Sequence, residues 1–171
     1  IGFKNSITWF EKNKKKNLSK KKQTAIIVGY GGSAKAVLYA LKKMEYESIQ
    51  IFNRSYEKIK NIKNIEPFEL KELINHTKNA DIVINTIPIN NFYLNGFKQL
   101  EKYGNYSKQN IGYDLAYNTQ TKFLDLFYQA QRITGVYMLI FQAAPCFEKW
   151  FGIKPQIDQE IIDMVFKKIK I

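Results

Sequence analysis

The sequence predicts an α/β domain with a doubly wound parallel sheet, in which helices cover both faces of the sheet. Three observations lead to this prediction. Short apolar runs rich in β-branched residues alternate with stretches of helical periodicity, which is typical of parallel sheets. The first of these runs ends in a glycine-rich turn. The length of 171 residues, 45% of them hydrophobic, suits one domain with a sizeable core.

The clearest unit covers residues 24–52. Thr24–Val28 is an apolar, β-branched run that predicts a buried strand. From Ser33 to Met44 apolar residues recur at helical spacing and lysines lie off that face, so we expect an amphipathic helix. Ser48–Phe52 predicts a second strand. Because a crossover helix joins them, the two strands should be parallel.

The alternation continues downstream. Further strands are predicted at Asp81–Asn85 and Ile111–Ala116, and a helix near Ser6–Glu11 precedes the first strand. The other predicted helices cover residues 55–61, 69–76, 97–103, 121–132, 138–150 and 158–168. We therefore expect one domain over residues 1–171. Within it, residues 1–22 form an N-terminal helix and a lysine-rich connector, and residues 157–171 form a C-terminal helix.

Composition limits the possible functions. The net charge is +12, but only two of the 27 basic residues are arginines, and the lysine-rich run Lys12–Lys22 indicates a solvated connector. Nucleic-acid binding is therefore the weaker alternative. One Cys and one His cannot form a structural zinc site, so we expect no metal. The lone Cys146 and the absence of a long apolar run favour a cytoplasmic protein without a membrane span.

The glycine turn after the first strand is typical of Rossmann-like dinucleotide-binding domains. Gly29 permits a sharp turn, Gly31 leaves space for a pyrophosphate, and Ala34 lets the helix pack closely on the sheet. The helix N-terminus offers N–H groups and a positive dipole end to the phosphates. Glycines also make ordinary turns, but a position between strand and helix favours nucleotide binding. The candidate residues in this turn are Gly29, Gly31, Gly32, Ser33 and Ala34.

The end of the second predicted strand favours NADP over NAD. An NAD site usually has an acidic residue there for the ribose 2′-hydroxyl, whereas this chain has Asn53, Arg54 and Ser55. Arg54 suits a 2′-phosphate, Ser55 can donate a hydroxyl, and Lys58 follows one helical turn later. The alternative interpretation is a solvated arginine followed by a serine that caps a helix.

Four blocks of the sequence together resemble shikimate dehydrogenase in order and spacing. The blocks are Gly29–Ala36, Asn53–Ser55, Tyr113–Leu124 and Met138–Trp150. The resemblance covers nearly the whole chain, but only the C-terminal, cofactor-binding domain of that family. It implies NADPH-dependent reduction of 3-dehydroshikimate to shikimate in aromatic amino-acid biosynthesis.

The resemblance also implies roles for particular residues. Gly29 to Ala34 would line the pyrophosphate, and Asn53 to Lys58 the adenosine end. Leu115, Gly135 and Met138 would lie near the nicotinamide, and Tyr117 and Gln142 would reach the substrate. No catalytic residue is expected in this chain, because the family's Lys and Asp pair belongs to an N-terminal domain that we expect to be missing here.

Some features remain open at this level. Tyr137 stands where the family often has a second glycine, so it either crowds the nicotinamide pocket or points away from it. The segment Asn85–Asn90 also differs from the family's adenosine-side segment. Gln142 lies inside an apolar helix, which predicts a buried amide that needs partners. Tyr117 could instead be a half-buried packing residue. A non-catalytic NADP-binding module and a quinate-specific enzyme stay as alternative functions.

Overall fold

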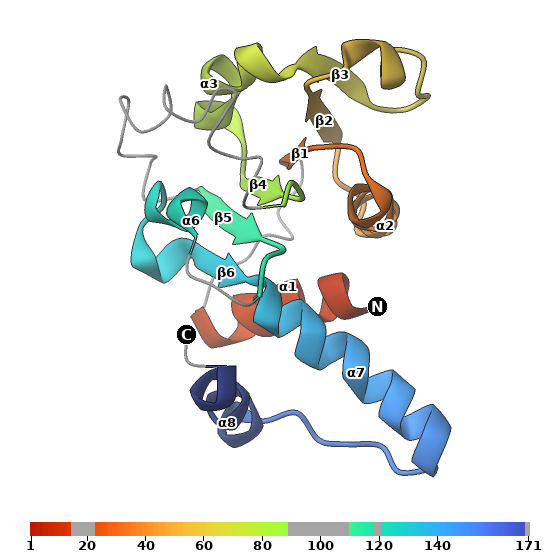
Figure 1. Ribbon diagram of the computed structural model, residues 1–171, viewed down its shortest axis with the longest axis vertical. Helices are drawn as coiled ribbons and strands as arrows, with labels where there is room; N and C mark the ends of the chain where they lie inside the picture. The colour runs from red at the N-terminus through yellow and green to blue at the C-terminus, as the bar shows by residue number, and fades with distance from the viewer. Residues whose placement is uncertain (15–22, 89–109, 118–120, 170–171) are drawn as a thin grey trace.

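The computed structural model describes residues 1–14, 23–88, 110–117 and 121–169, and within them the centre of the fold is a six-stranded parallel sheet (Figure 1). The strand order is β3-β2-β1-β4-β5-β6. The strands are β1 (Thr24–Val28), β2 (Ser48–Asn53), β3 (Glu66–Glu69), β4 (Ile82–Asn85), β5 (Ile111–Asp114) and β6 (Arg132–Thr134). The predicted parallel α/β sheet is confirmed.

Helices of very different length precede, connect and follow the strands. They are α1 (Gly2–Lys14), α2 (Gly32–Lys43), α3 (Leu73–His76), α6 (Lys122–Asp125), α7 (Gly135–Phe151) and α8 (Gln159–Ile169). Short 3₁₀ turns lie at Tyr56–Lys58, Leu70–Glu72, Thr77–Asn79 and Gln129–Gln131. None of the helices in the described ranges is both long and apolar enough to cross a membrane.

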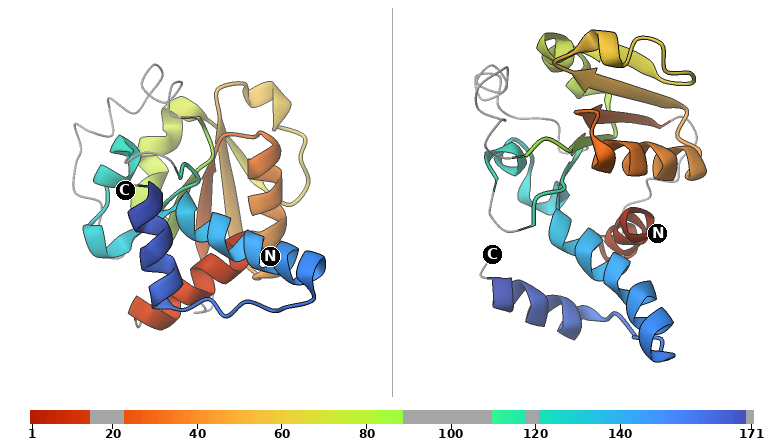
Figure 2. Two further views of the ribbon diagram at one scale, coloured as in Figure 1. Left: turned by 60° about the horizontal axis from the view of Figure 1, so that its bottom comes forward. Right: turned by 45° about the vertical axis from the view of Figure 1, so that its right-hand side comes forward.

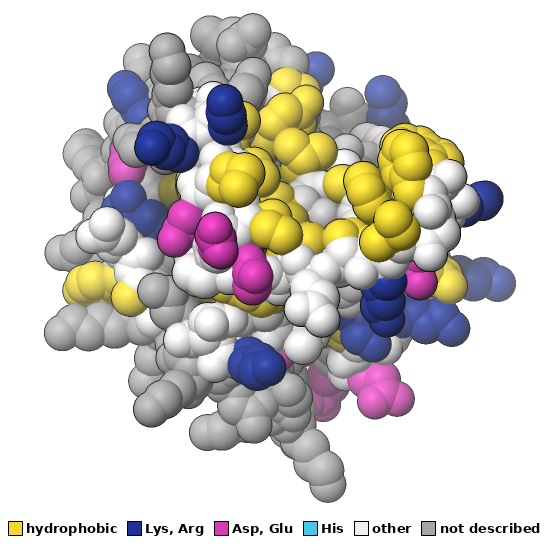
Figure 3. All heavy atoms as spheres, turned by 90° about the horizontal axis from the view of Figure 1, so that it is seen from below, with side chains coloured by type: hydrophobic (Ala, Val, Ile, Leu, Met, Phe, Trp, Pro, Cys, Tyr) yellow, Lys and Arg dark blue, Asp and Glu magenta, His cyan; other side chains and the backbone are white. Residues whose placement is uncertain are grey.

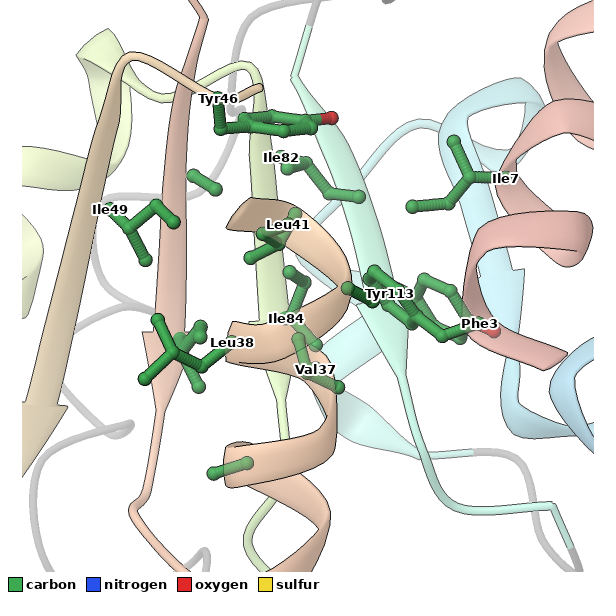
Figure 4. Packing of buried hydrophobic residues seen from close by; sticks show 14 of the residues in the cluster. Phe3, Ile7, Val37, Leu38, Leu41, Tyr46, Ile49, Ile82, Ile84 and Tyr113 are labelled. Carbon is green, nitrogen blue, oxygen red and sulfur yellow. The ribbon is translucent and has the colours of Figure 1, made fainter. Parts of the chain in front are cut away.

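Alternate residues of each central strand point to opposite faces of the sheet, and each face has its own core. In β1, Ala25 and Ile27 pack against α1 and α2, as Figure 4 shows for their neighbours from the other strands. Ile26 and Val28 pack in a second cluster with residues of α3 and α6. Both clusters are closed to solvent, so the sheet is covered on its two faces, as expected for a doubly wound fold.

The N-terminal helix is fixed to the sheet through β5. The Phe3 ring stacks on the Tyr113 ring with centroids 5.0 Å apart, and the Ser6 and Tyr113 hydroxyls form a buried hydrogen bond of 2.7 Å. Figure 4 shows Phe3 and Tyr113 side by side, between α2 and α1 in this view. The helix therefore belongs to the core of this domain, although it precedes the first strand in sequence.

A third apolar cluster joins α7 to α8. Val136 and Ile140 pack with Ile162 of α8 and with Trp9 of α1. The two helices extend away from the sheet in Figure 2, with α1 alongside α7. This pair therefore has only one of its sides covered by the rest of the described chain.

Two of the strands were not predicted from the sequence. β3 contains Glu66, Pro67 and Glu69 around one Phe, a composition typical of a loop, and it forms because the edge of β2 offers hydrogen-bonding partners. β6 has three residues and pairs with β5, where a helix over 121–132 was predicted. That helix is in fact the short α6 followed by a 3₁₀ turn.

Other boundaries moved by a few residues. The helix predicted at 55–61 is only a 3₁₀ turn at Tyr56–Lys58, and the strand predicted to reach Ala116 ends at Asp114. α1 is longer than predicted, and α7 begins three residues earlier, at Gly135. The helix predicted at 97–103 and the lysine-rich connector to residue 22 lie outside the described residues.

Candidate functional site

A pocket of about 290 Å³ lies at the carboxyl ends of β1 and β2. Because neighbouring parallel strands end at the same edge, the glycine turn after β1 and the Asn53–Ser55 segment after β2 meet there. The lining residues are Gly29, Tyr30, Gly31, Asn53, Arg54, Ser55, Lys58, Leu70, Thr86, Ile87 and Pro88. The structure thus brings together six of the sequence-predicted candidates.

The glycine turn is shaped by close backbone contacts. Gly29 has φ +98, and its N–H donates to the Phe52 carbonyl at 2.8 Å. A Cβ there would lie 2.7 Å from Thr86 Oγ1, a hydroxyl that itself donates to the Val28 carbonyl at 2.7 Å. Gly29 is therefore required both by its backbone conformation and by the close approach of the segment that follows β4.

Gly31 and Gly32 are different, because packing within the chain does not require glycine at either position. A Cβ on either residue would meet no described atom within 4 Å. Gly31 is the N-cap of α2, and no side chain caps that helix end in the described part of the chain. The first N–H groups of α2 consequently face open space beside the pocket.

The rest of the turn divides between surface and core. Ala34 is fully buried against the sheet, which agrees with close helix packing. Ser33 is exposed on the first turn of α2, and neither residue lines the pocket.

The segment after β2 places two cations at the pocket. Arg54 and Lys58 are exposed, and the Asn53 amide donates to the Ser55 carbonyl at 3.1 Å, which fixes the turn. Ser55 stands at the N-cap of the 3₁₀ turn, but its side chain makes no capping hydrogen bond. No Asp or Glu is among the described residues that line the pocket.

A second group of candidates lies where β5 and β6 end. The Gly135 N–H donates to the Ala116 carbonyl at 3.0 Å, and a Cβ on Gly135 would lie 2.1 Å from the Leu115 carbonyl oxygen. The start of α7 therefore touches the segment after β5, and only glycine permits this contact. Met138 follows one turn later in α7.

The two residues expected to reach substrate lie farther out. Tyr117 is 50% exposed, so this side chain is half-buried, and its exposure is compatible with both of the roles considered for it. Gln142 is exposed, which corrects the expectation of a buried amide: it borders open cavities and not the core. Gln142 and Met138 line a cavity of about 830 Å³ beside Gly2, whose missing Cβ lets α1 approach Gln142.

Tyr137 points away from the candidate nicotinamide region. Its ring contacts those of Trp9 and Phe166, with centroids 5.1 and 5.2 Å away. Burial raises its pKa, and Asp163 adds to the rise. Of the two alternatives left open by the sequence, the structure favours packing between α1, α7 and α8.

Tyr30 and Leu70 line the pocket, although the sequence did not mark them as candidates. The run Thr86–Pro88 also lines it, and it belongs to the segment Asn85–Asn90 that differs from the family's adenosine-side segment. A signal for the run was available, because Asp81–Asn85 was predicted as a parallel strand, and the residues after it must reach the same edge of the sheet.

Comparison with known proteins identifies the family of this chain. The sequence model of the family described as "Shikimate / quinate 5-dehydrogenase" matches residues 11–117. A shikimate dehydrogenase (NADP(+)) from Pelagibacter ubique is 34% identical over 173 residues, covering 96% of this chain and 60% of the relative. The corresponding protein of Bartonella quintana is 31% identical over 150 residues, which cover 81% of this chain and 51% of that protein. The chain spans about half the length of the curated relatives it matches.

Solved structures share the fold. The shikimate dehydrogenase of Thermotoga maritima superposes with a TM-score of 0.64 at 24% identity, covering 98% of this chain and 64% of that protein. A chorismate mutase/shikimate 5-dehydrogenase fusion protein from Clostridium acetobutylicum gives a TM-score of 0.66 at 26% identity, with coverage of 99% and 62%. Family model, relatives and fold agree, and this chain belongs to the shikimate / quinate 5-dehydrogenase family.

Proposed function

We propose that this chain binds NADP(H) and forms the cofactor-binding half of an oxidoreductase that interconverts 3-dehydroshikimate and shikimate. The observation that carries the proposal is the pocket at the ends of β1 and β2. It combines an open glycine turn with two cations and, among its described lining residues, no carboxylate. Relatives named shikimate dehydrogenase (NADP(+)) support the same cofactor and substrate.

The glycine turn fits a pyrophosphate. Gly31 and Gly32 leave space that no described atom of the chain fills, and the uncapped N-terminus of α2 points its N–H groups there. Lys35, whose Nζ lies 5.5 Å from the Tyr30 ring centroid, adds a positive charge on the first turn of the helix. A doubly negative group would therefore be stabilised at this end of α2 by dipole and charge together.

The segment after β2 fits a 2′-phosphate. Arg54 offers a planar set of donors, Lys58 a second cation, and Ser55 a hydroxyl with no capping role. An acidic residue, which would accept from a free ribose 2′-hydroxyl, is missing from the described lining. The site should therefore prefer NADP(H) to NAD(H).

The nicotinamide is proposed to lie toward Leu115, Gly135 and Met138, with Tyr117 and Gln142 on the side of the substrate. When bound, the cofactor supplies or accepts the hydride. The chain's own residues hold its two ends and orient the ring. Proton transfer to the substrate oxygen is assigned to the Lys and Asp pair that the family carries on its other domain.

We propose that a substrate-binding domain covers the outer side of α7 and α8. Trp150 is 74% exposed and Phe151 61%, and with Phe147 they border an apolar cavity of about 760 Å³. Figure 3 shows hydrophobic side chains gathered on the face that carries these helices. Apolar surface of this extent is typical of an interface, and the length by which relatives exceed this chain is sufficient for a second domain.

The decisive experiment is a nucleotide titration followed by a turnover assay. The chain should bind NADPH more tightly than NADH, and it should reduce 3-dehydroshikimate only when joined to a substrate domain of the family. Tight binding without turnover in the joined protein would favour a non-catalytic NADP-binding module. Faster oxidation of quinate than of shikimate would make the enzyme a quinate dehydrogenase.

A further inference from the structure

The last residues of β4 and β5 form a buried polar cluster beside the candidate cofactor site. Asn85 and Asp114 are paired in the sheet register, and each is 1% exposed. Asn85 Nδ2 donates to Asp114 Oδ1 at 3.0 Å. Thr121, also buried, donates its hydroxyl to Asp114 Oδ2 at 2.5 Å.

The same carboxyl group holds the backbone that leaves β5. The Ala116 N–H donates to Asp114 Oδ1 at 3.1 Å, and the Leu115 N–H donates to the Asn85 carbonyl at 3.1 Å. The Ala116 carbonyl then accepts from the Gly135 N–H at the start of α7. Both N–H groups and one carbonyl of Leu115–Ala116 are thus fixed by named partners.

We infer that Asp114 is a positioning residue for the nicotinamide end of the site, an inference that rests on the proposed function. Asp114 does not line the pocket at β1 and β2. It acts through the segment 115–116, which carries Leu115 and contacts Gly135. A buried carboxyl group with three donors is costly to retain unless the geometry that it fixes is needed.

The adenosine end has its own support. The Ile87 N–H donates to Asn85 Oδ1 at 3.1 Å, and Asn85 Nδ2 also donates to the Ile87 carbonyl at 3.2 Å. Gly29 and Thr86 are held by bonds to strand carbonyls. Asn85 bonds to both Asp114 and Ile87, but its two bonds to Ile87 need no atom of Asp114, and Gly29 and Thr86 are held without either residue. Loss of Asp114 should therefore affect the two ends of a dinucleotide unequally.

The test compares NADPH with adenosine 2′,5′-bisphosphate, which lacks the nicotinamide half. In Asp114→Ala the Kd for NADPH should rise about tenfold, the effect of losing one hydrogen bond to a charged group. The Kd for the bisphosphate should change less than about twofold. Asp114→Asn keeps an oxygen for Ala116 and should recover most of the NADPH affinity. Asp125→Ala, at an exposed carboxylate, is the matched control and should change neither Kd.

Amide hydrogen exchange in the free protein gives a second readout. The Ala116 amide should exchange about tenfold faster in Asp114→Ala, while the Ile27 amide in β1 stays protected. If Asp114→Ala does not fold, Thr121→Val and Thr121→Ser replace it in the test. Only the valine variant should weaken the binding of NADPH.

Several results would overturn the inference. They are an equal loss of affinity for both ligands, no loss of affinity for either ligand, or an unchanged rate of amide exchange at Ala116. Failure of the wild-type chain to bind NADPH and the bisphosphate would instead refute the proposed function. That result is seen before any variant is made, and the exchange measurement then still decides whether Asp114 fixes the segment.

Discussion

Replacing Arg54 by alanine should remove much of the preference for NADP(H). Arg54 and Lys58 are the two cations that line the pocket after β2. A charge-assisted hydrogen bond contributes about 1.5–3 kcal/mol. Because Arg54 is exposed and Lys58 remains, we take the lower end of this range, about 1.5 kcal/mol, which corresponds to roughly a tenfold rise in the Kd for NADPH.

The assay is a fluorescence titration of NADPH and NADH against the wild-type chain and the variant. The Kd for NADH should stay the same, so the ratio of the two constants should fall about tenfold. Arg132→Ala is the matched control: Arg132 pairs with Asp125 at 3.0 Å and donates to the Phe127 carbonyl, away from the pocket. Equal affinities of the wild-type chain for the two nucleotides, or an unchanged ratio in Arg54→Ala, would refute the assignment.

Three further predictions concern stability, pH and turnover. Gly29→Ala should lower the free energy of unfolding by at least ~1–2 kcal/mol in denaturant titration, because its φ is +98 and its Cβ would press on Thr86. Burial raises the pKa of Asp114 above its ordinary value, although bonds from Thr121, Ala116 and Asn85 oppose the rise. The stability that Asp114 contributes is therefore full below its unfolded pKa of about 4 and declines as pH rises through the folded pKa. Wild type should lose stability relative to Asp114→Asn as pH rises above about 4. A difference that stays constant with pH contradicts this. The chain alone should show no NADPH-dependent reduction of 3-dehydroshikimate, because the general acid is expected on the other domain and general acid catalysis typically contributes about 10²–10⁴ in rate. Once a substrate domain is joined, Tyr117→Phe and Gln142→Ala should slow the reaction. Steady oxidation of NADPH by the chain alone would place the proton donor within these residues.

The sequence was sufficient where local chemistry decides structure. Thr24–Val28 is a strand with the predicted bounds, and the turn after it requires glycine at position 29 for reasons visible in the pattern. The Asn53–Ser55 segment was likewise found from its place after a strand. In these cases hydrophobic periodicity and turn chemistry act within a few residues, so the local sequence is enough to predict the local structure.

Only the tertiary structure decided the features that depend on distant partners. β3 is a polar segment that becomes a strand because the edge of β2 is next to it. Gln142 is exposed although its helix is apolar, because it borders open cavities on α7 and not the core. Asp114 meets Asn85 across 29 residues of sequence, at the paired ends of two parallel strands. Strand order and helix orientation are set by packing across the whole domain, and no local pattern encodes which buried polar groups will then face each other.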